Sequence, residues 1–157
     1  MRQIREMRRK DRQITDIKWI EDVLLSAKFL HLGLSGDDGW PYVVPLCYGY
    51  KDMTLYFHGA LEGMKHDILS LNQRACFQVT IDTEVLRSEV AQSFSMYFKS
   101  VTGFGVVKTL NDIDEKTDAL NILMDQYEGP HINLREIKMP VWVARLDIES
   151  MTGKAHV

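Results

Sequence analysis

The chain has 157 residues, of which 45% are hydrophobic and 26% are charged, and these proportions are ordinary for a globular protein that buries a core of its own. A formal net charge of −3 gives the surface as a whole no attraction for nucleic acid, which argues against such a partner. No apolar run is long enough to span a bilayer, and no signal-peptide core follows the basic start. We therefore expect one domain over residues 1–157, located in the cytoplasm, with no membrane partner.

The first predicted elements are a basic arm over residues 1–14 and a helix. The arm has six Lys and Arg side chains against two acidic ones, so it either binds an anionic partner or is a solvated segment that wraps a partner. Asp16 is a candidate N-cap for the helix, because apolar residues follow it at helical spacing. This stripe comprises Ile17, Ile20, Leu24 and Ala27.

The middle of the chain alternates apolar and polar residues as strands do, with turn signals between the runs. Pro45 indicates an edge strand, a bulge or a place where the ladder opens for a ligand. The polar residues 83–93 predict a loop or an irregular arm. Strands are expected over residues 29–35, 42–50, 54–58 and 75–82, and a long one with a bend at Gly103 and Gly105 over residues 94–110.

Glycine and lysine meet at the corner between the third of these strands and a short helix. Gly59 and Gly63 permit backbone angles that other residues resist. Lys65, in the first turn of the helix, adds a full charge to the partial positive charge of the helix N-terminus. The corner therefore either holds a cofactor phosphate or is ordinary turn chemistry, since no Walker or G-x-G-x-x-G pattern follows any strand. The predicted helical stripe comprises Leu61, Met64, Ile68 and Leu71.

A longer helix and a last strand complete the predicted fold. Asp112 and Glu115 resemble a capping box at the helix start, and Gly129 and Pro130 end the helix. Residues 141–148 alternate as a strand. Because hairpin-linked strands dominate and the helices are not regularly interleaved, we expect a mainly β fold. Its architecture would be a small antiparallel barrel, closed or half-open, with flanking helices.

Metal-ligand patterns are weak in this chain. His58, His66 and His131 match no common ligand spacing, and Cys47 and Cys76 have no C-x-x-C arrangement. Both cysteines lie in apolar runs, so we expect buried thiols in a reducing compartment. The sequence therefore predicts no metal site.

Several segments occur together in one order along nearly the whole chain: residues 7–15, 41–49, 55–65, 100–105, 114–116 and 152–154. In this combination the chain resembles the FMN-binding split barrels related to pyridoxamine 5′-phosphate oxidase, and within them the 5-nitroimidazole-resistance (Nim-like) group. The resemblance implies an FMN-binding split β-barrel of antiparallel Greek-key type. It also implies a homodimer with FMN at the subunit interface.

The resemblance further implies the residues that would contact FMN. Those along the isoalloxazine ring would be Val43, Val44, Pro45, Leu46 and Cys47. Those at the ring and ribityl chain would be His58, Gly59 and Ala60, with Lys65 at the phosphate. A further group would contribute from near the phosphate or from the partner subunit: Lys99, Ser100, Val101 and Thr102.

The function implied by the resemblance is a flavin-dependent oxidoreductase. It would reduce a small nitro-aromatic or similar acceptor with electrons from a nicotinamide or a reductase. His58 is the candidate proton donor because imidazole titrates near neutral pH; otherwise it packs or hydrogen-bonds the flavin. The alternative is a non-catalytic flavin- or haem-binding protein for sensing, storage or electron transfer. Vitamin B6 phosphate is not expected, because residues 42–46 lack arginine and Trp142 with Arg145 matches only part of the oxidases' pattern.

Overall fold

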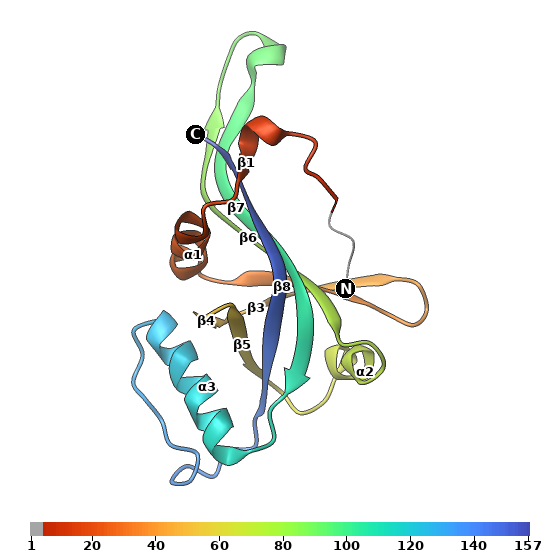
Figure 1. The fold of residues 1–157 in the computed structure, drawn as a ribbon, viewed down its shortest axis with the longest axis vertical. Coiled ribbons are helices and arrows are strands. Elements are labelled where there is room, and N and C mark those ends of the chain that lie inside the picture. The colour runs from red at the N-terminus through yellow and green to blue at the C-terminus, as the bar shows by residue number, and fades with distance from the viewer. Residues whose placement is uncertain (1–4) are drawn as a thin grey trace.

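The computed structural model describes residues 5–157 and shows a curved antiparallel sheet with α-helices packed around it (Figure 1). The strands are β1 (Gln13–Ile14), β2 (Leu30–Ser35), β3 (Pro41–Leu46), β4 (Gly49–Lys51), β5 (Thr54–Gly59), β6 (Arg74–Leu86), β7 (Ser95–Thr109) and β8 (Trp142–His156). The α-helices are α1 (Ile17–Ser26), α2 (Met64–Leu71) and α3 (Ile113–Gln126), and the 3-10 turns are η1 (Lys10–Arg12) and η2 (Ala91–Ser93).

The strand order is β3-β2-β6-β7-β8-β5-β4, and β1 pairs with β8 as well. All of these pairings are antiparallel. The long strand β8 pairs with β7 along one edge and, along the other edge, first with β5 and then with β1. The expectation of a mainly β, antiparallel fold with flanking helices is confirmed.

The sheet curls because the strands at the two ends of its order, β3 and β4, are neighbours in the chain. Only Cys47 and Tyr48 separate them, and two residues span about 10 Å at most. Away from this junction the two edges are not paired with each other: β3 pairs with β2, while residues 57–59 of β5 extend past β4 and pair with β8. We call these two unpaired edges the seam, and because of the seam the barrel is split. The junction at Cys47 and Tyr48 also divides the single strand predicted over residues 42–50 into β3 and β4.

The core lies where the alternating faces of the strands meet α1. In β2 the three leucines are buried and the residues between them are not, as a period of two requires. The side chain of Asp16 accepts a hydrogen bond from the N–H of Lys18 at 3.0 Å, so the predicted cap of α1 is confirmed. The buried stripe of α1 begins at Ile20, since Ile17 is 49% exposed.

Helix α3 lies directly on β4. A Cβ added at Gly49 would stand 2.8 Å from the backbone nitrogen of Leu123, so only glycine permits this approach. Asp112 caps the helix through its side chain, which accepts hydrogen bonds from the N–H groups of Asp114 and Glu115, both at 3.0 Å. The predicted cap of α3 is therefore confirmed.

Three predicted features differ from the structure. The polar segment 83–93 is partly strand, because β6 and β7 continue into a hairpin arm that projects beyond the barrel (Figure 1). The last strand does not end at residue 148 but runs to His156 as β8. Cys47 is exposed, because it lies at the junction between two strands rather than within one.

The stripe predicted for α2 is also wrong in most positions. Of its four members only Ile68 is buried, and Leu69 is the second buried residue of the helix. The other three, Leu61, Met64 and Leu71, are exposed. This eight-residue helix contacts the core only through Ile68 and Leu69. The apolar residues before and after them therefore do not form a buried stripe.

The basic arm is partly paired within the chain. Residues 1–4, including Arg2, lie outside the described residues. Lys10 forms an ion pair with Glu6, and Arg9 forms one with Asp11. The arm ends in β1, which pairs with the last part of β8. Within residues 5–157 no helix combines the length and the apolar character that a membrane crossing needs.

Candidate functional site

The corner between β5 and α2 brings three residues of different elements together. The ammonium of Lys65 lies over the ring of Trp142, 4.8 Å from its centroid. Trp142 stands directly across from Gly59 in the pairing of β8 with β5. A Cβ at Gly59 would come within 3.1 Å of the Lys65 Nζ, so glycine leaves the space that the ammonium occupies. The position of the Lys65 ammonium therefore depends on Gly59 and Trp142 of the sheet as well as on α2.

Further contacts hold this corner rigid. The His66 ring meets the Trp142 ring edge-on with centroids 4.7 Å apart, and its Nε2 lies 2.5 Å from the carbonyl oxygen of Ala60. The indole N–H of Trp142 donates to the Oγ1 of Thr109 at 3.1 Å. A polar cavity of about 320 Å³ adjoins these rings, lined by residues such as Ser70 and Thr109. Side chains fixed in this way preorganise a binding site.

The charge of Lys65 has no counterpart within the described part of the chain. The side chain is half-buried, and it makes no ion pair with any residue from 5 to 157. Burial lowers the pKa of Lys65 below its ordinary value of 10.5, because desolvation disfavours the ammonium. The residue before the helix, Gly63, has φ of +125° and no side chain to cap the first N–H groups. An anion at this corner would restore the solvation that the ammonium loses.

The expected ring-binding strand borders the seam. Side chains of β3 alternate: Val44 and Leu46 pack against the core, while Val43 is 61% exposed and Pro45 is exposed too. Gly59 ends the opposite edge of the seam and leads through Ala60 into the Lys65 corner. The structure therefore places residues 43–47 along the free edge of β3, and it places Gly59, Ala60 and Lys65 at the corner that follows β5.

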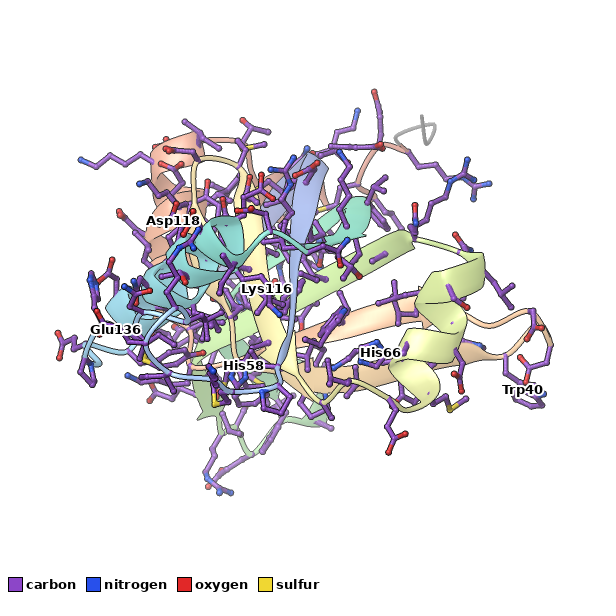
Figure 2. The ribbon with its side chains drawn as sticks, turned by 90° about the horizontal axis from the view of Figure 1, so that it is seen from below. Trp40, His58, His66, Lys116, Asp118 and Glu136 are labelled. Atoms are coloured by element: carbon purple, nitrogen blue, oxygen red, sulfur yellow. The ribbon has the colours of Figure 1, made fainter. Side chains whose placement is uncertain are left out.

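His58 points to a different side of β5 from the Lys65 corner. Successive strand residues face opposite ways, and His58 shares its face with Val143, its partner in β8. Val143 packs against Ala119 and Leu120 of α3. The imidazole is exposed, and Figure 2 shows His66 on α2, whereas His58 lies away from that helix. His58 thus has solvent access at the end of the seam.

The four predicted residues of β7 lie far along the strand from Lys65 within one subunit. Thr102 is seven residues from Thr109, which contacts Trp142, a separation of about 20 Å along a strand. Lys99 forms an ion pair with Asp82 at 2.7 Å. Ser100 donates to the carbonyl oxygen of Lys154 at 3.3 Å, and Val101 is fully buried. The structure therefore does not bring these residues to the corner.

Thr102 instead borders space on the face of the sheet that points away from the core. It lines a cavity of about 500 Å³ between the basic arm and β7–β8. A neighbouring cavity of about 600 Å³ lies over β2, β6 and β7, with Cys76 and Arg74 in its lining, and Phe104 borders both cavities. Sequence reasoning gave neither Arg74 nor Phe104 a role in binding, although Phe104 lies within the matched segment 100–105.

Metal ligation has no basis in the described part of the chain. Within residues 5–157 no group of three or more His, Cys, Asp or Glu side chains is arranged to hold an ion. His131 lies 2.6 Å from Asp125 in an exposed pair, and His66 is engaged with Trp142.

Comparison with known proteins identifies the family. A family model described as pyridoxamine 5′-phosphate oxidase matches residues 16–155. The chain belongs to this family, as the resemblance predicted. No curated protein matches the chain.

Solved structures agree in fold. A candidate 5-nitroimidazole antibiotic resistance protein from Bacteroides thetaiotaomicron is 30% identical with a TM-score of 0.79, over 91% of this chain and 86% of that chain. An FAD-binding protein from Mesorhizobium loti is 25% identical with a TM-score of 0.66, over 93% and 98% of the two chains. A flavocytochrome from Azotobacter vinelandii has a TM-score of 0.80 at 22% identity, over 97% and 72%, and this likeness concerns the fold alone.

Proposed function

We propose that the protein binds FMN and acts as a flavin-dependent oxidoreductase on a small nitro-aromatic or similar acceptor. The observation that carries the proposal is the half-buried ammonium of Lys65, which has no ion-pair partner among residues 5–157. A phosphate is the anion that suits a lysine at a helix start. Family membership and the named relatives support a flavin as the molecule that carries it.

The residues of the seam would orient the cofactor. Lys65 would hold the phosphate, and Gly59 with Ala60 would leave room for the ribityl chain. The backbone of residues 43–47 would lie along the ring, because this edge of β3 has N–H and C=O groups that no neighbouring strand takes. When bound, FMN supplies hydride or single-electron transfer, while the protein supplies orientation and electrostatics.

His58 is proposed as the group that delivers protons to the acceptor. Its imidazole is exposed at the end of the seam, so it can exchange protons with solvent. Positioned acid catalysis of this kind typically accelerates a reaction by a factor of about 100 or more. Electrons would come from a nicotinamide or from a reductase.

A second copy of the chain would complete the site. Lys99, Ser100, Val101 and Thr102 lie about 20 Å or more along β7 from the Lys65 corner, so within one subunit they cannot share a ligand with it. The cavities beside Thr102 and Phe104 open on the sheet face away from the core. In a homodimer this face would meet the partner, and the partner's cofactor would lie against it.

The absorption spectrum of the purified protein tests the proposal first. Flavin bands, with FMN identified after extraction, support it; a Soret band would indicate haem and the alternative of a carrier or sensor. Oxidation of reduced nicotinamide on addition of a nitroimidazole then distinguishes a reductase from a non-catalytic flavin protein. A colourless protein that does not take up FMN at high concentration would refute the proposal.

A further inference from the structure

We propose that a cavity under the loop between α3 and β8 binds an organic monoanion with a short apolar body, such as a medium-chain carboxylate. The cavity has a volume of about 450 Å³, which lies in the range of small-molecule sites. We call it the lysine-rimmed cavity; Ile113, Lys116, Leu134, Ile137, Lys138 and Met139 line it. It is separate from the Lys65 corner, and the inference does not depend on flavin binding.

Most of the side chains that line the cavity are apolar. Leu134 is buried and forms the floor, in the same apolar cluster as Ile113 and Val143. Above it, Ile137 and Met139 are each 47% exposed although they lie in an irregular loop. Large apolar side chains gathered at the rim of a concave site suit an apolar ligand body.

Hydrogen bonds to α3 anchor the first part of the loop. Asn121 exchanges two hydrogen bonds with the backbone of Ile132, at 2.8 and 3.0 Å. The N–H of Leu134 donates to the Thr117 Oγ1 at 3.2 Å. The N–H groups of Glu136 and Ile137 both donate to the carbonyl oxygen of Asn133, at 3.1 and 3.0 Å, so hydrogen bonds fix the loop as far as Ile137 at the cavity.

Two positive charges at this cavity have no partner within the described residues. Neither Lys116 nor Lys138 forms an ion pair with any residue from 5 to 157. No acidic side chain lines the cavity.

Two carboxylates close in sequence to Lys116 are already engaged. Asp112 caps α3, and Asp114 holds Arg135 through two hydrogen bonds of 2.8 Å. Figure 2 shows Asp118 and Glu136 well apart from Lys116. The cavity therefore has an apolar floor and a cationic rim, and an amphipathic anion complements both.

Calorimetric titration of the full-length protein with octanoate tests this inference, and octanamide serves as the neutral probe of the same shape. We expect octanoate to bind and octanamide to bind at least fivefold more weakly, with the octanoate affinity falling as salt is added. Lys116→Gln and Lys138→Gln should each raise the octanoate Kd by about two- to fivefold. Ile137→Glu, at an exposed position, should abolish binding by adding a negative charge to the rim. Lys51→Gln, at the exposed end of β4, is the matched control and should leave the Kd unchanged.

The inference is overturned if octanoate does not bind, if octanamide binds as tightly, or if both lysine variants bind like the wild type. Because the titration does not read out flavin, a protein that fails to bind FMN but binds octanoate with this pattern would refute only the proposed function. The reverse result would refute only the lysine-rimmed cavity.

Discussion

Replacing Lys65 by methionine should change the affinity for flavin and the stability of the flavin-free protein in different directions. Methionine keeps an unbranched apolar side chain and removes the charged head that lies over Trp142. The ammonium would otherwise make a charge-assisted contact with the FMN phosphate worth about 2 kcal/mol. We therefore expect the FMN Kd of Lys65→Met to rise about thirtyfold.

The flavin-free protein should not lose stability from the same change. The pKa of Lys65 is lowered because burial disfavours its charged form, so at neutral pH the folded state carries a desolvation cost that the unfolded state does not. This cost is fully present below the folded pKa and is relieved as the pH rises towards the unfolded value of 10.5. The Tm of flavin-free Lys65→Met should equal or exceed that of the wild type at pH 7, and the difference should shrink near pH 10.

Two measurements decide this prediction. Fluorescence quenching of FMN gives the Kd, and differential scanning calorimetry of the flavin-free protein gives the Tm; Lys51→Met, an exposed lysine of β4, is the control for both. An FMN Kd within twofold of the wild type would show that the phosphate is not held at Lys65. A Tm that falls along with the affinity would make Lys65 a structural residue supporting Trp142.

The remaining predictions concern the same corner, the proposed proton donor and two buried tyrosines. Gly59→Ala places a Cβ 3.1 Å from the Lys65 Nζ, so the flexible lysine head must shift. We expect the FMN Kd to rise about three- to tenfold in titrations, because part of a charge-assisted contact is lost. An unchanged Kd would show that the ammonium has no fixed position. His58→Ala should change the free energy of unfolding by less than about 0.5 kcal/mol because the side chain is exposed. In stopped-flow assays the rate of nitro reduction should fall about a hundredfold. Equal rates in the variant and the wild type would show that His58 does not donate the proton. Burial raises the pKa of Tyr50 to about 12 and raises that of Tyr48 as well. Because unfolded tyrosines ionise near pH 10, urea titrations should show stability falling from pH 10 towards 12, less steeply in Tyr50→Phe; a flat profile in the wild type would contradict the assignment.

Local signals in the sequence were sufficient for many elements of this fold. Asp16 and Asp112 were recognised as caps because a side-chain oxygen before an apolar stripe acts on N–H groups two or three residues away. The bend at Gly103 and Gly105 was placed correctly, and the pairing of β7 with β8 shifts register between Phe104 and Gly105. A Cβ at Gly105 would stand 2.2 Å from a carbonyl oxygen of β8, which explains the glycine there.

Features that depend on partners distant in the chain were not predictable. The polar segment 83–93 gave no strand signal, because β6 and β7 form an arm that pairs with itself away from the core. Apolar and polar residues alternate only weakly in β8 after residue 148. Backbone pairing with β7 and β1 holds this half of the strand in place, so it does not need an apolar face. Exposure of Cys47 follows from the junction between two strands, which no local pattern marks.

Some features of the candidate site could likewise be predicted from the sequence, and others depend on the tertiary structure. The glycine, the lysine and the helix start at residues 59–65 are a local pattern, and the sequence alone determined that a positive charge follows a strand at this point. Only the tertiary structure decided that the charge is half-buried and lacks a counterion among residues 5–157. Trp142 comes from a strand 77 positions after Lys65 and reaches it through the register of β8 on β5. Hydrogen-bond spacing and capping act over a few residues, whereas burial and charge pairing are set by packing between segments that are remote along the chain.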